Sequence, residues 1–407
     1  MPSPPDQGSA GAANGATQGA RQSRPMNPTD ARFDVSVRGR GAVGQALALS
    51  LAHLGLRVAL GGAAAPAAPD VRTFARGARS VALLQRLKVW DALCAATPSA
   101  VTAVHDMRVF GDAGAELGFS AWQQGVRELA WIVDAAALER ELASALRFSP
   151  HVTLLADPAG AAPATHGVQA DLVALCDGRH SPERAALGVE VKRSDYGQRA
   201  IAARLACERP HRGTAWQWFG APDVLALLPF DAPPARGGFG LVWSLPAARA
   251  EAFLTASDSE FERAVNAATG GAAGPLTLAS ARASWPLGLA RARRWHGPGW
   301  VLLGDAAHVV HPLAGQGLNL GLADVDALSE VLAAREAWRG VGDERLLARY
   351  ARARAAPTWA MGSVTDGLWQ LFSRPGAPFV ELRNRGMTLV NHLPPLKRWL
   401  ANRAMRG

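Results

Sequence analysis

The sequence predicts an α/β fold that opens with a Rossmann-type dinucleotide-binding unit. A short apolar run at residues 33–37 leads directly into Gly39-Arg40-Gly41-Ala42-Val43-Gly44. Residues 45–54 then have the small and apolar side chains of a buried helix, and residues 56–60 read as a second strand. A glycine-rich turn between a strand and a helix is the context that makes this hexapeptide informative.

Each glycine of this turn has a predicted physical task. Gly39 permits a tight turn, Gly41 lets the backbone approach a pyrophosphate, and Gly44 lets helix and strand pack closely. The helix N-terminus then offers unpaired N–H groups and a partial positive charge to the phosphates. A carboxylate normally ends the second strand and binds the ribose hydroxyls, but here Gly61 stands in that place. Either cofactor affinity is reduced, or another group compensates.

Further along the chain, apolar patterns predict a helix over residues 80–93, strands within 101–133 and a helix over 135–146. Buried strands are predicted at 152–155, 172–175 and 300–303, a strand-rich region at 196–245, and mainly helices after Gly317. Residues 1–31 are rich in Gly, Ala, Ser, Pro and Gln and predict a disordered tail without a secretory signal. Two interpretations of this tail are open: translation starts at Met26, or the preceding residues are a functionless or targeting extension.

Composition excludes several classes of protein. The chain has 407 residues, of which 49% are hydrophobic, so a wholly disordered chain is excluded. The formal net charge of +9 is carried by scattered arginines without a nucleic-acid-binding motif, so nucleic acid is not a predicted partner. Three cysteines without C-x-x-C spacing favour a reducing compartment and argue against a zinc site. No apolar run is long enough to predict a membrane-spanning helix.

The most informative stretch runs from Gly304 to Asp324. A strand ends at Gly304-Asp305, a loop containing His308 and Pro312 follows, and a long helix begins near Gly315. Asp305 therefore stands at a strand C-terminus, where ligands of parallel sheets bind. We interpret His308 as a residue that orients the loop, because a metal site is not predicted.

This stretch resembles the signature of FAD-dependent aromatic hydroxylases of the ubiquinone-biosynthesis family, which are relatives of para-hydroxybenzoate hydroxylase. Its part His-Pro-Leu-Ala-Gly-Gln-Gly-x-Asn-x-Gly-x-x-Asp matches the family pattern at every fixed position. Residues 39–44 resemble the ADP-binding turn, and residues 170–184 resemble the Asp-Gly motif of that family. The resemblance extends from residue 33 to about residue 400.

The resemblance implies a Rossmann-type FAD-binding domain interleaved with a β-sheet substrate domain, followed by C-terminal helices. The expected FAD-binding domain comprises residues 32–97, 134–185 and 296–356. The expected substrate domain comprises 98–133 and 186–295, and the C-terminal helical region 357–407.

The resemblance also implies a set of cofactor-binding residues. Asp305, with Gly304, would hold the ribityl chain, and Arg72 would lie near the pyrophosphate and the ring. Asp177 and Gly178 would serve cofactor binding and control access of the nicotinamide. The residues beside the isoalloxazine would be Pro312, Gly315, Gln316 and Gly317, with Asn319 in the same site. Ala135 departs from the family, where a polar residue near the flavin is common.

No side chain is predicted to carry the reaction, because the chemistry belongs to the flavin. The resemblance implies that NAD(P)H reduces FAD, O2 adds at C4a, and the hydroperoxide transfers one oxygen to a phenol ring. The leading prediction is hydroxylation of a polyprenyl phenol in ubiquinone biosynthesis. The alternatives are hydroxylation of another aromatic metabolite, or a non-catalytic paralogue that binds partner enzymes of a biosynthetic complex.

The substrate side is predicted from apolar residues in the strand-rich region, since apolar walls suit a prenylated phenol. These residues are Trp216, Trp218, Phe219, Leu227, Pro229 and Trp243, with His211 as a polar group. The alternative is that they form ordinary sheet core and that His211 is a surface residue. A cytoplasmic protein is predicted. Residues 387–405 form either a helix packed on the main body or a membrane-surface helix that gives peripheral contact with the inner membrane.

Overall fold

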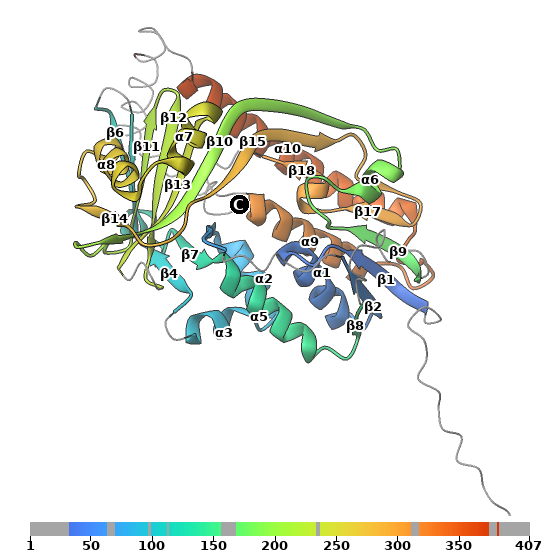
Figure 1. The fold of residues 1–407 in the computed structure, drawn as a ribbon. Coiled ribbons are helices and arrows are strands. Elements are labelled where there is room, and N and C mark those ends of the chain that lie inside the picture. The colour runs from blue at the N-terminus through green and yellow to red at the C-terminus, as the bar shows by residue number, and fades with distance from the viewer. Residues whose placement is uncertain are drawn as a thin grey trace, which may run out of the picture.

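The computed structural model describes residues 32–62, 70–96, 99–111, 114–155, 168–232, 237–310, 317–373 and Glu381. The predicted tail, the loop residues Pro312, Gly315 and Gln316, and the segment 387–405 lie outside the described residues. Figure 1 shows two parts joined by long strands, with a helix-covered parallel sheet at the lower right and a larger sheet at the left and top.

The parallel sheet forms the Rossmann-type part, with strand order β16-β17-β9-β1-β2-β8. β1 lies between β2 and β9, pairs with both in parallel, and is buried apart from its start. Of the strands described in this sheet, only β16 runs antiparallel, against β17. The strands are β1 (Arg32–Arg38), β2 (Val58–Gly61), β8 (Val152–Leu154), β9 (Gln169–Leu175), β16 (His296–Gly297) and β17 (Trp300–Leu302).

Helices cover one face of this sheet and bury its apolar side chains in a large core, while the other face packs in smaller clusters. α1 packs against both α5 and α9, and α9 packs against α10. The helices are α1 (Ala42–His53), α2 (Ala78–Arg86), α3 (Trp90–Ala95), α5 (Ala135–Arg147), α9 (Gly317–Ala333) and α10 (Glu344–Ser373). The single helix predicted over residues 80–93 is wrong, because Lys88 has a left-handed backbone with φ of 61° and separates α2 from α3.

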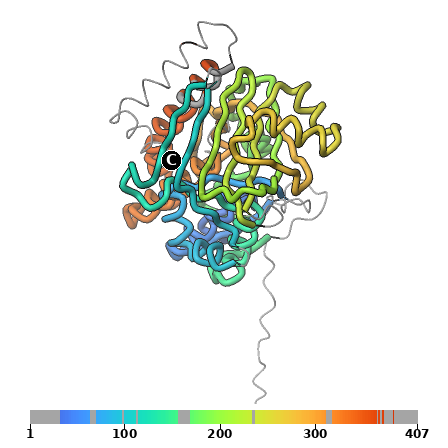
Figure 2. The backbone as a smooth tube through the Cα atoms, turned by 90° about the vertical axis from the view of Figure 1, so that its left-hand side faces the viewer, coloured from blue at the N-terminus to red at the C-terminus, as the bar shows by residue number. Residues whose placement is uncertain are grey.

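The larger sheet has the strand order β18-β15-β10-β13-β12-β11-β5-β6, and β14 also pairs with β10. Figure 2 shows the teal β5–β6 hairpin extending the green and yellow strands β10 to β13. The strands are β5 (Asp106–Phe110), β6 (Glu116–Ser120), β10 (Val191–Cys207), β11 (Thr214–Gly220), β12 (Asp223–Phe230), β13 (Gly238–Pro246), β14 (Leu276–Leu278), β15 (Ala283–Ala292) and β18 (His308–Val309).

Smaller elements connect and cover these sheets. A small antiparallel sheet of β3 (Thr73–Arg76), β7 (Ala130–Asp134) and β4 (Val101–Val104) lies between the two parts. α7 (Ala247–Thr255) and α8 (Asp258–Thr269) cover one face of the larger sheet, with α4 (Ala121–Gln124) and α6 (Pro182–Ala186) as short turns. The boundary expected at residue 356 falls inside α10, which continues to Ser373.

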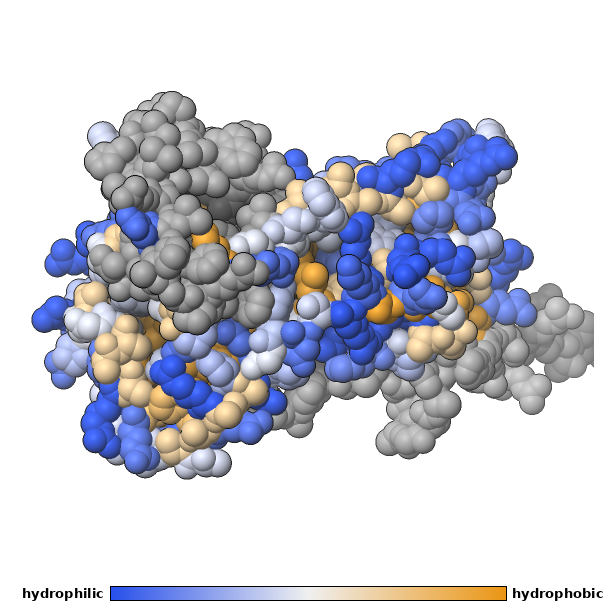
Figure 3. All heavy atoms as spheres, turned by 90° about the horizontal axis from the view of Figure 1, so that it is seen from above, coloured by the Kyte–Doolittle hydropathy of each residue, from blue (hydrophilic) through white to orange (hydrophobic). Residues whose placement is uncertain are grey.

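The length of the helices and the hydropathy of the surface are both relevant to contact with a membrane. Among the described residues, no helix is long and apolar enough to span a bilayer. On the face drawn in Figure 3, hydrophilic side chains interrupt the apolar surface of the described residues.

Candidate cofactor and active site

The turn after β1 forms a cradle of backbone above the N-terminus of α1. Gly39 has φ of 112°, and a Cβ there would lie 2.2 Å from the carbonyl oxygen of Cys176. A Cβ on Gly44 would lie 1.9 Å from the carbonyl oxygen of Gly39. Both positions therefore require glycine. A Cβ on Gly41 would meet nothing within 4 Å, so the space in front of the helix is open.

The N-terminus of α1 is suited to an anion. Gly41 is its N-cap, without a side-chain hydrogen bond, and the first turn contains no acidic residue. The first N–H groups of the helix thus remain available to a ligand, and the helix dipole favours a negative charge there.

The Asp-Gly turn follows β9 and is held by hydrogen bonds. The Ser181 hydroxyl donates to Oδ2 of Asp177 at 2.7 Å and accepts from the backbone N–H of Arg184 at 3.0 Å. Burial raises the pKa of the Asp177 carboxyl, and the Ser181 hydrogen bond opposes that rise. The buried Arg184 side chain donates to the carbonyl of Ala306 at 2.7 Å. The Asp-Gly turn is thereby tied to the Gly-Asp turn.

The Gly-Asp turn places a carboxylate at the end of the parallel sheet. Gly304 has φ of 58° and begins a short 3-10 helix, Gly304–Ala306, which is separated from β17 by Leu303 alone. Asp305 remains accessible to solvent, yet the walls of the site desolvate its carboxyl and raise its pKa. The charges of His308, Arg179 and Arg72 act in the opposite direction, so Asp305 lies in a partly cationic surrounding.

Arg72 lies across the site from Asp305 and is itself held in place. Its guanidinium donates to Asp70 at 2.8 Å from Nε and 2.6 Å from Nη2, and it lies 5.5 Å from the ring centre of Phe74. The hydrogen bonds with Asp70 raise the pKa of Arg72, so its charge is permanent. Its carbonyl accepts from the N–H of Ala135, which begins α5 and is fully buried.

The aromatic residues predicted to wall the substrate pocket lie on the wrong face of the larger sheet. Trp243 is 1% exposed and packs against Phe253 of α7 and Phe261 of α8, with ring centres 5.1 and 6.2 Å apart. The strand register places the other predicted residues on this same helix-covered face; they are Trp216, Trp218, Leu227 and Pro229. Because side chains alternate between faces, this face is turned away from the Rossmann-type part. Their assignment as pocket walls is therefore wrong: Leu227 and Trp243 are sheet core, and the partly exposed Trp216 and Trp218 pack against that core.

Trp216 and Trp218 also stack on Phe110 of β5, with ring centres 6.0 and 5.6 Å apart. Phe219 points to the opposite face, where it packs with Val109, Leu117 and Val224. It belongs to a core cluster at the β5–β6 end of the sheet, and Leu371 of α10 packs against that cluster.

His211 holds the turn between β10 and β11. Its Nε2 lies 2.9 Å from Oδ1 of Asp231, and its Nδ1 accepts from the N–H of Gly213 at 3.0 Å. The ring packs edge-on against Phe239, a member of the core beneath α7 and α8. The structure gives His211 this structural role, and the prediction of a pocket group is wrong.

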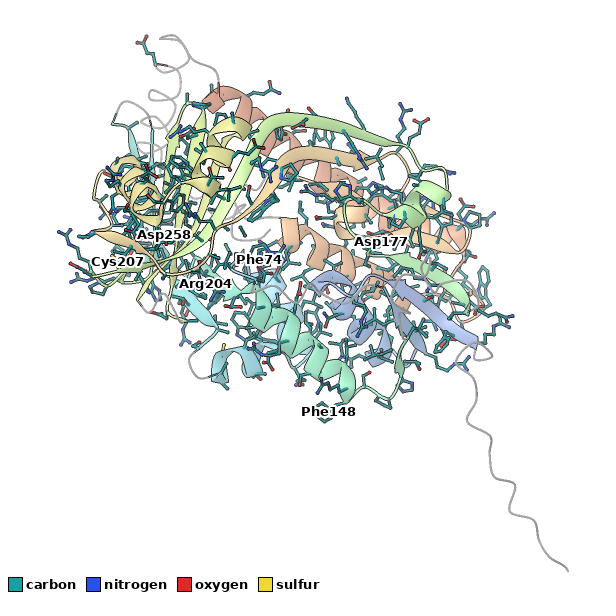
Figure 4. All side chains as sticks on the ribbon, in the orientation of Figure 1. Phe74, Phe148, Asp177, Arg204, Cys207 and Asp258 are labelled. Carbon is teal, nitrogen blue, oxygen red and sulfur yellow. The ribbon has the colours of Figure 1, made fainter. Side chains whose placement is uncertain are left out.

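The opposite face of the sheet is turned toward the Rossmann-type part. Arg204 of β10 donates to Oδ2 of Asp134 at 2.7 Å and to the carbonyl of Asp70 at 3.2 Å. A Cβ on Gly240 of β13 would lie 2.3 Å from Oγ1 of Thr73. Figure 4 shows Arg204 and Phe74 in the region between the two parts, whereas Phe148 points outward at the end of α5.

The register places a row of small and aliphatic side chains on this inner face. Ala202, Val242 and Ala226 are cross-strand neighbours, and Leu228 lies opposite Gly240. Val242, Ala226 and Leu228 are partly exposed although they lie within the sheet. Sequence reasoning missed them. No local signal marks them, because these strands have apolar residues on both faces.

Comparisons with known proteins establish the family to which this site belongs. The family model described as "FAD binding domain" matches residues 32–365. The chain belongs to this family. FAD is therefore its cofactor, and the resemblance seen in the sequence is confirmed.

Relatives in this family are named as hydroxylases. The 3-demethoxyubiquinol 3-hydroxylase of Escherichia coli (strain K12) is 32% identical over 390 residues, which cover 91% of this chain and 97% of the relative. Ubiquinone hydroxylase UbiL of Rhodospirillum rubrum is 32% identical over 392 residues, covering 91% and 89% of the two chains. The human ubiquinone biosynthesis monooxygenase COQ6 is 28% identical over 439 residues, covering 91% and 92%.

Solved structures of flavin monooxygenases share the fold. PqsL from Pseudomonas aeruginosa, a probable FAD-dependent monooxygenase, aligns with a TM-score of 0.71 at 21% identity over 88% of this chain and 100% of that one. The p-nitrophenol 4-monooxygenase PnpA from Pseudomonas putida DLL-E4 aligns with a TM-score of 0.72 at 18% identity over 92% and 98%. The predicted α/β fold class is confirmed.

The residues present fit FAD. The open space before Gly41 and the uncapped start of α1 suit its pyrophosphate, and the accessible Asp305 carboxylate suits its ribityl hydroxyls. Gly317 begins α9 at the same edge. Among the described residues, no group of three His, Cys, Asp or Glu side chains could hold a metal ion.

Asn319 has a more specific place than the sequence indicated. Its Oδ1 accepts from the Ser80 hydroxyl at 2.8 Å, and its Nδ2 donates to the carbonyl of Ala75 at 3.0 Å. The amide is buried and fastens the first turn of α9 to β3 and α2. The structure therefore shows Asn319 joining α9 to β3 and α2.

The position at which the sequence predicted the missing ribose-binding acid, residue 61, also needs correction. A Cβ on Gly61 would point at Leu155, 3.3 Å from its Cδ1, and at Arg38, 3.6 Å from its Nη1. The next residue, Gly62, has φ of 118°, and a Cβ there would lie 2.9 Å from the backbone nitrogen of Gly39. Successive residues of a strand point in opposite directions, so position 62 faces the glycine-rich turn. The expectation that residue 61 points toward the ribose is wrong.

Proposed function

We propose that this chain is an FAD-dependent monooxygenase that hydroxylates the ring of a prenylated phenol in ubiquinone biosynthesis, using NAD(P)H and O2. The names of its relatives support the reaction class and the pathway. The observation that carries the substrate class is the inner face of the sheet, where Ala226, Leu228 and Val242 present apolar, partly exposed side chains toward the FAD-binding part.

The polypeptide contributes binding and orientation. FAD, when bound, supplies the redox chemistry and the activation of O2. The N-terminus of α1 binds the pyrophosphate, while Asp305 accepts hydrogen bonds from the ribityl hydroxyls. Asp177, Gly178 and Arg72 complete the proposed cofactor site beside these groups. The domain boundaries inferred from the sequence are kept in this proposal, except that α10 continues past residue 356.

The inner face of the sheet orients the substrate. Its apolar side chains favour an aromatic ring and a prenyl chain over water, and exclusion of water strengthens the polar contacts that position the ring. Arg204 and Asp134 fix the distance between this face and the FAD-binding part by a buried ion pair. The sheet therefore holds the reacting ring at a defined place without a catalytic side chain.

The proposal includes association with other proteins of the pathway and peripheral contact with the inner membrane. We also propose that the protein is located in the cytoplasm. The segment proposed for membrane contact, 387–405, lies outside the described residues.

Product analysis in a bacterial host that lacks one ring hydroxylase of ubiquinone biosynthesis tests the function. The proposal predicts that this chain restores the missing hydroxylated intermediate and that Asp305→Ala does not. Purified protein that contains FAD but restores no intermediate in any such host would favour another aromatic substrate. Colourless protein that takes up no FAD would favour the non-catalytic alternative.

A further inference from the structure

A buried carboxylate lies beneath the Gly-Asp turn and is shared by four elements. Asp324 of α9 is fully buried, and its Oδ2 accepts from the backbone N–H of Gly304 at 2.9 Å. The same oxygen lies 2.6 Å from Nε2 of His308 in β18. Its Oδ1 accepts from Nε of Arg354 in α10 at 2.7 Å. His308 and Arg354 are 4% and 5% exposed, so water does not screen this cluster.

The cluster holds the backbone on both sides of Asp305. Gly304 directly precedes Asp305 in the chain, and His308 follows Asp305 by three residues. Both of these residues bond to one oxygen of Asp324, so the position of that oxygen sets the path of the segment between them. The accessible Asp305 carboxylate is the group on this segment that suits the ribityl chain.

Arg354 in turn fixes Asp324. Besides its bond to the carboxylate, its Nη2 donates to the carbonyl of Leu320 at 3.2 Å, so one guanidinium binds α9 at two points. Figure 1 shows α9 and α10 on the same side of the parallel sheet, and the two helices pack together. Arg354 lies outside the glycine-rich motif and was not singled out by the sequence.

We propose that Arg354 and Asp324 are positioning residues for FAD, which act through the backbone of Gly304 and through His308 on the direction of the Asp305 carboxylate. A buried carboxylate that loses its cation either takes up a proton or draws water, and both changes lengthen its bonds to Gly304 and His308. The effect then reaches the cofactor although Arg354 does not touch it. The inference depends on FAD binding alone, so its failure would leave the hydroxylase proposal untouched.

The test compares Arg354→Met and Arg354→Lys with a matched control, Arg352→Met. Arg352 lies two positions before Arg354 on α10 and is exposed to solvent. Each apoprotein is titrated with FAD, followed by flavin fluorescence, and the visible absorption band of the bound flavin is recorded. Thermal unfolding of each apoprotein shows whether it is folded.

The proposal predicts that Arg354→Met apoprotein binds FAD about tenfold more weakly than the wild type, with a shifted flavin band. Arg354→Lys is expected to recover part of the affinity, because an ammonium keeps the charge opposite Asp324 but cannot also donate to Leu320 in the same geometry. Arg352→Met should match the wild type.

Folded Arg354→Met apoprotein with wild-type FAD affinity and an unchanged flavin band would overturn the proposal and leave Arg354 a purely structural role. If Arg354→Met does not fold, the FAD affinity of the Arg354→Lys variant tests the proposal instead. Weakened FAD binding by folded Arg354→Lys supports the proposal, and wild-type affinity overturns it.

Discussion

In the proposed active site, the two parts would bind their ligands by different physical means. The FAD-binding part presents backbone N–H groups at the start of α1 and one carboxylate, Asp305, on a turn held by a hydrogen bond from the Gly304 backbone to the buried Asp324. The larger sheet presents side chains on its inner face, while α7 and α8 pack against its outer face. The first part depends on exact backbone geometry, so it tolerates few substitutions. The proposed substrate face depends on side-chain size, so we expect changes there to alter the choice of substrate and to leave FAD binding intact.

The largest expected effect lies on the outer face of the sheet. Trp243→Ala removes a ring that packs between Phe253 and Phe261, and a buried Trp→Ala substitution lowers the free energy of unfolding by about 3–5 kcal/mol. The folded fraction should keep its kcat/KM, because Trp243 faces away from FAD. Urea denaturation and steady-state kinetics measure the two quantities. Unchanged stability with lost activity would place Trp243 at the substrate after all.

Asp305→Ala should mainly affect the cofactor. A charged hydrogen bond contributes about 1.5–3 kcal/mol, which corresponds to about a tenfold to hundredfold loss of FAD affinity. Burial raises the pKa of the Asp305 carboxyl, so the ionised carboxylate disfavours the folded apoprotein at neutral pH, and its removal should leave the apoprotein's thermal unfolding temperature unchanged or slightly raised. FAD titration of the apoprotein provides the measurement. A variant that purifies yellow with full occupancy contradicts the assignment.

Val242→Trp tests the inner face directly. The larger ring would occupy the space in front of Ala202 and Ala226, so kcat/KM for a prenylated phenol should fall about tenfold while FAD affinity stays the same. The matched control is Trp243→Phe, one residue along on the outer face, for which kcat/KM should change little. Equal losses of kcat/KM in Val242→Trp and Trp243→Phe would contradict the assignment, because they would show that any disturbance of the sheet lowers activity.

The smallest expected effect concerns the missing ribose-binding acid. The sequence alone predicts that Gly61→Glu tightens FAD binding. The structure predicts no gain, because the new side chain would point toward Leu155 and Arg38. Equilibrium titration with FAD decides between the two predictions, and a clearly tighter complex would refute the orientation found here.

The contrast between the two parts also explains what the sequence could reveal. Gly39 and Gly44 could be predicted because any Cβ at either position would collide with backbone, so the pattern has one structural solution. The face of the sheet on which Trp243 lies could not be predicted, because strands β10 to β13 have apolar residues on both faces. The alternation of side chains along a strand separates the two faces but does not show which of them is turned toward FAD.

Contacts between residues far apart in the chain could not be predicted from the sequence either. The bond from Arg354 to Asp324 joins two helices, through residues that are separated by 30 positions in the chain, and nothing local marks the pair. The break at Lys88 depends on a positive φ in a residue that commonly occurs within helices. The one-residue error at Gly61 arose because the sequence shows where a strand ends only approximately.

The proposed hydroxylase reaction is tested most directly by following an oxygen atom from O2 into the product. Purified protein reconstituted with FAD is supplied with NAD(P)H, a prenylated phenol and isotopically labelled O2, and the product is analysed by mass spectrometry. We expect a hydroxylated ring that carries one labelled oxygen atom from O2. Oxidation of NAD(P)H that yields only hydrogen peroxide, or a product that takes its oxygen from water, would contradict it.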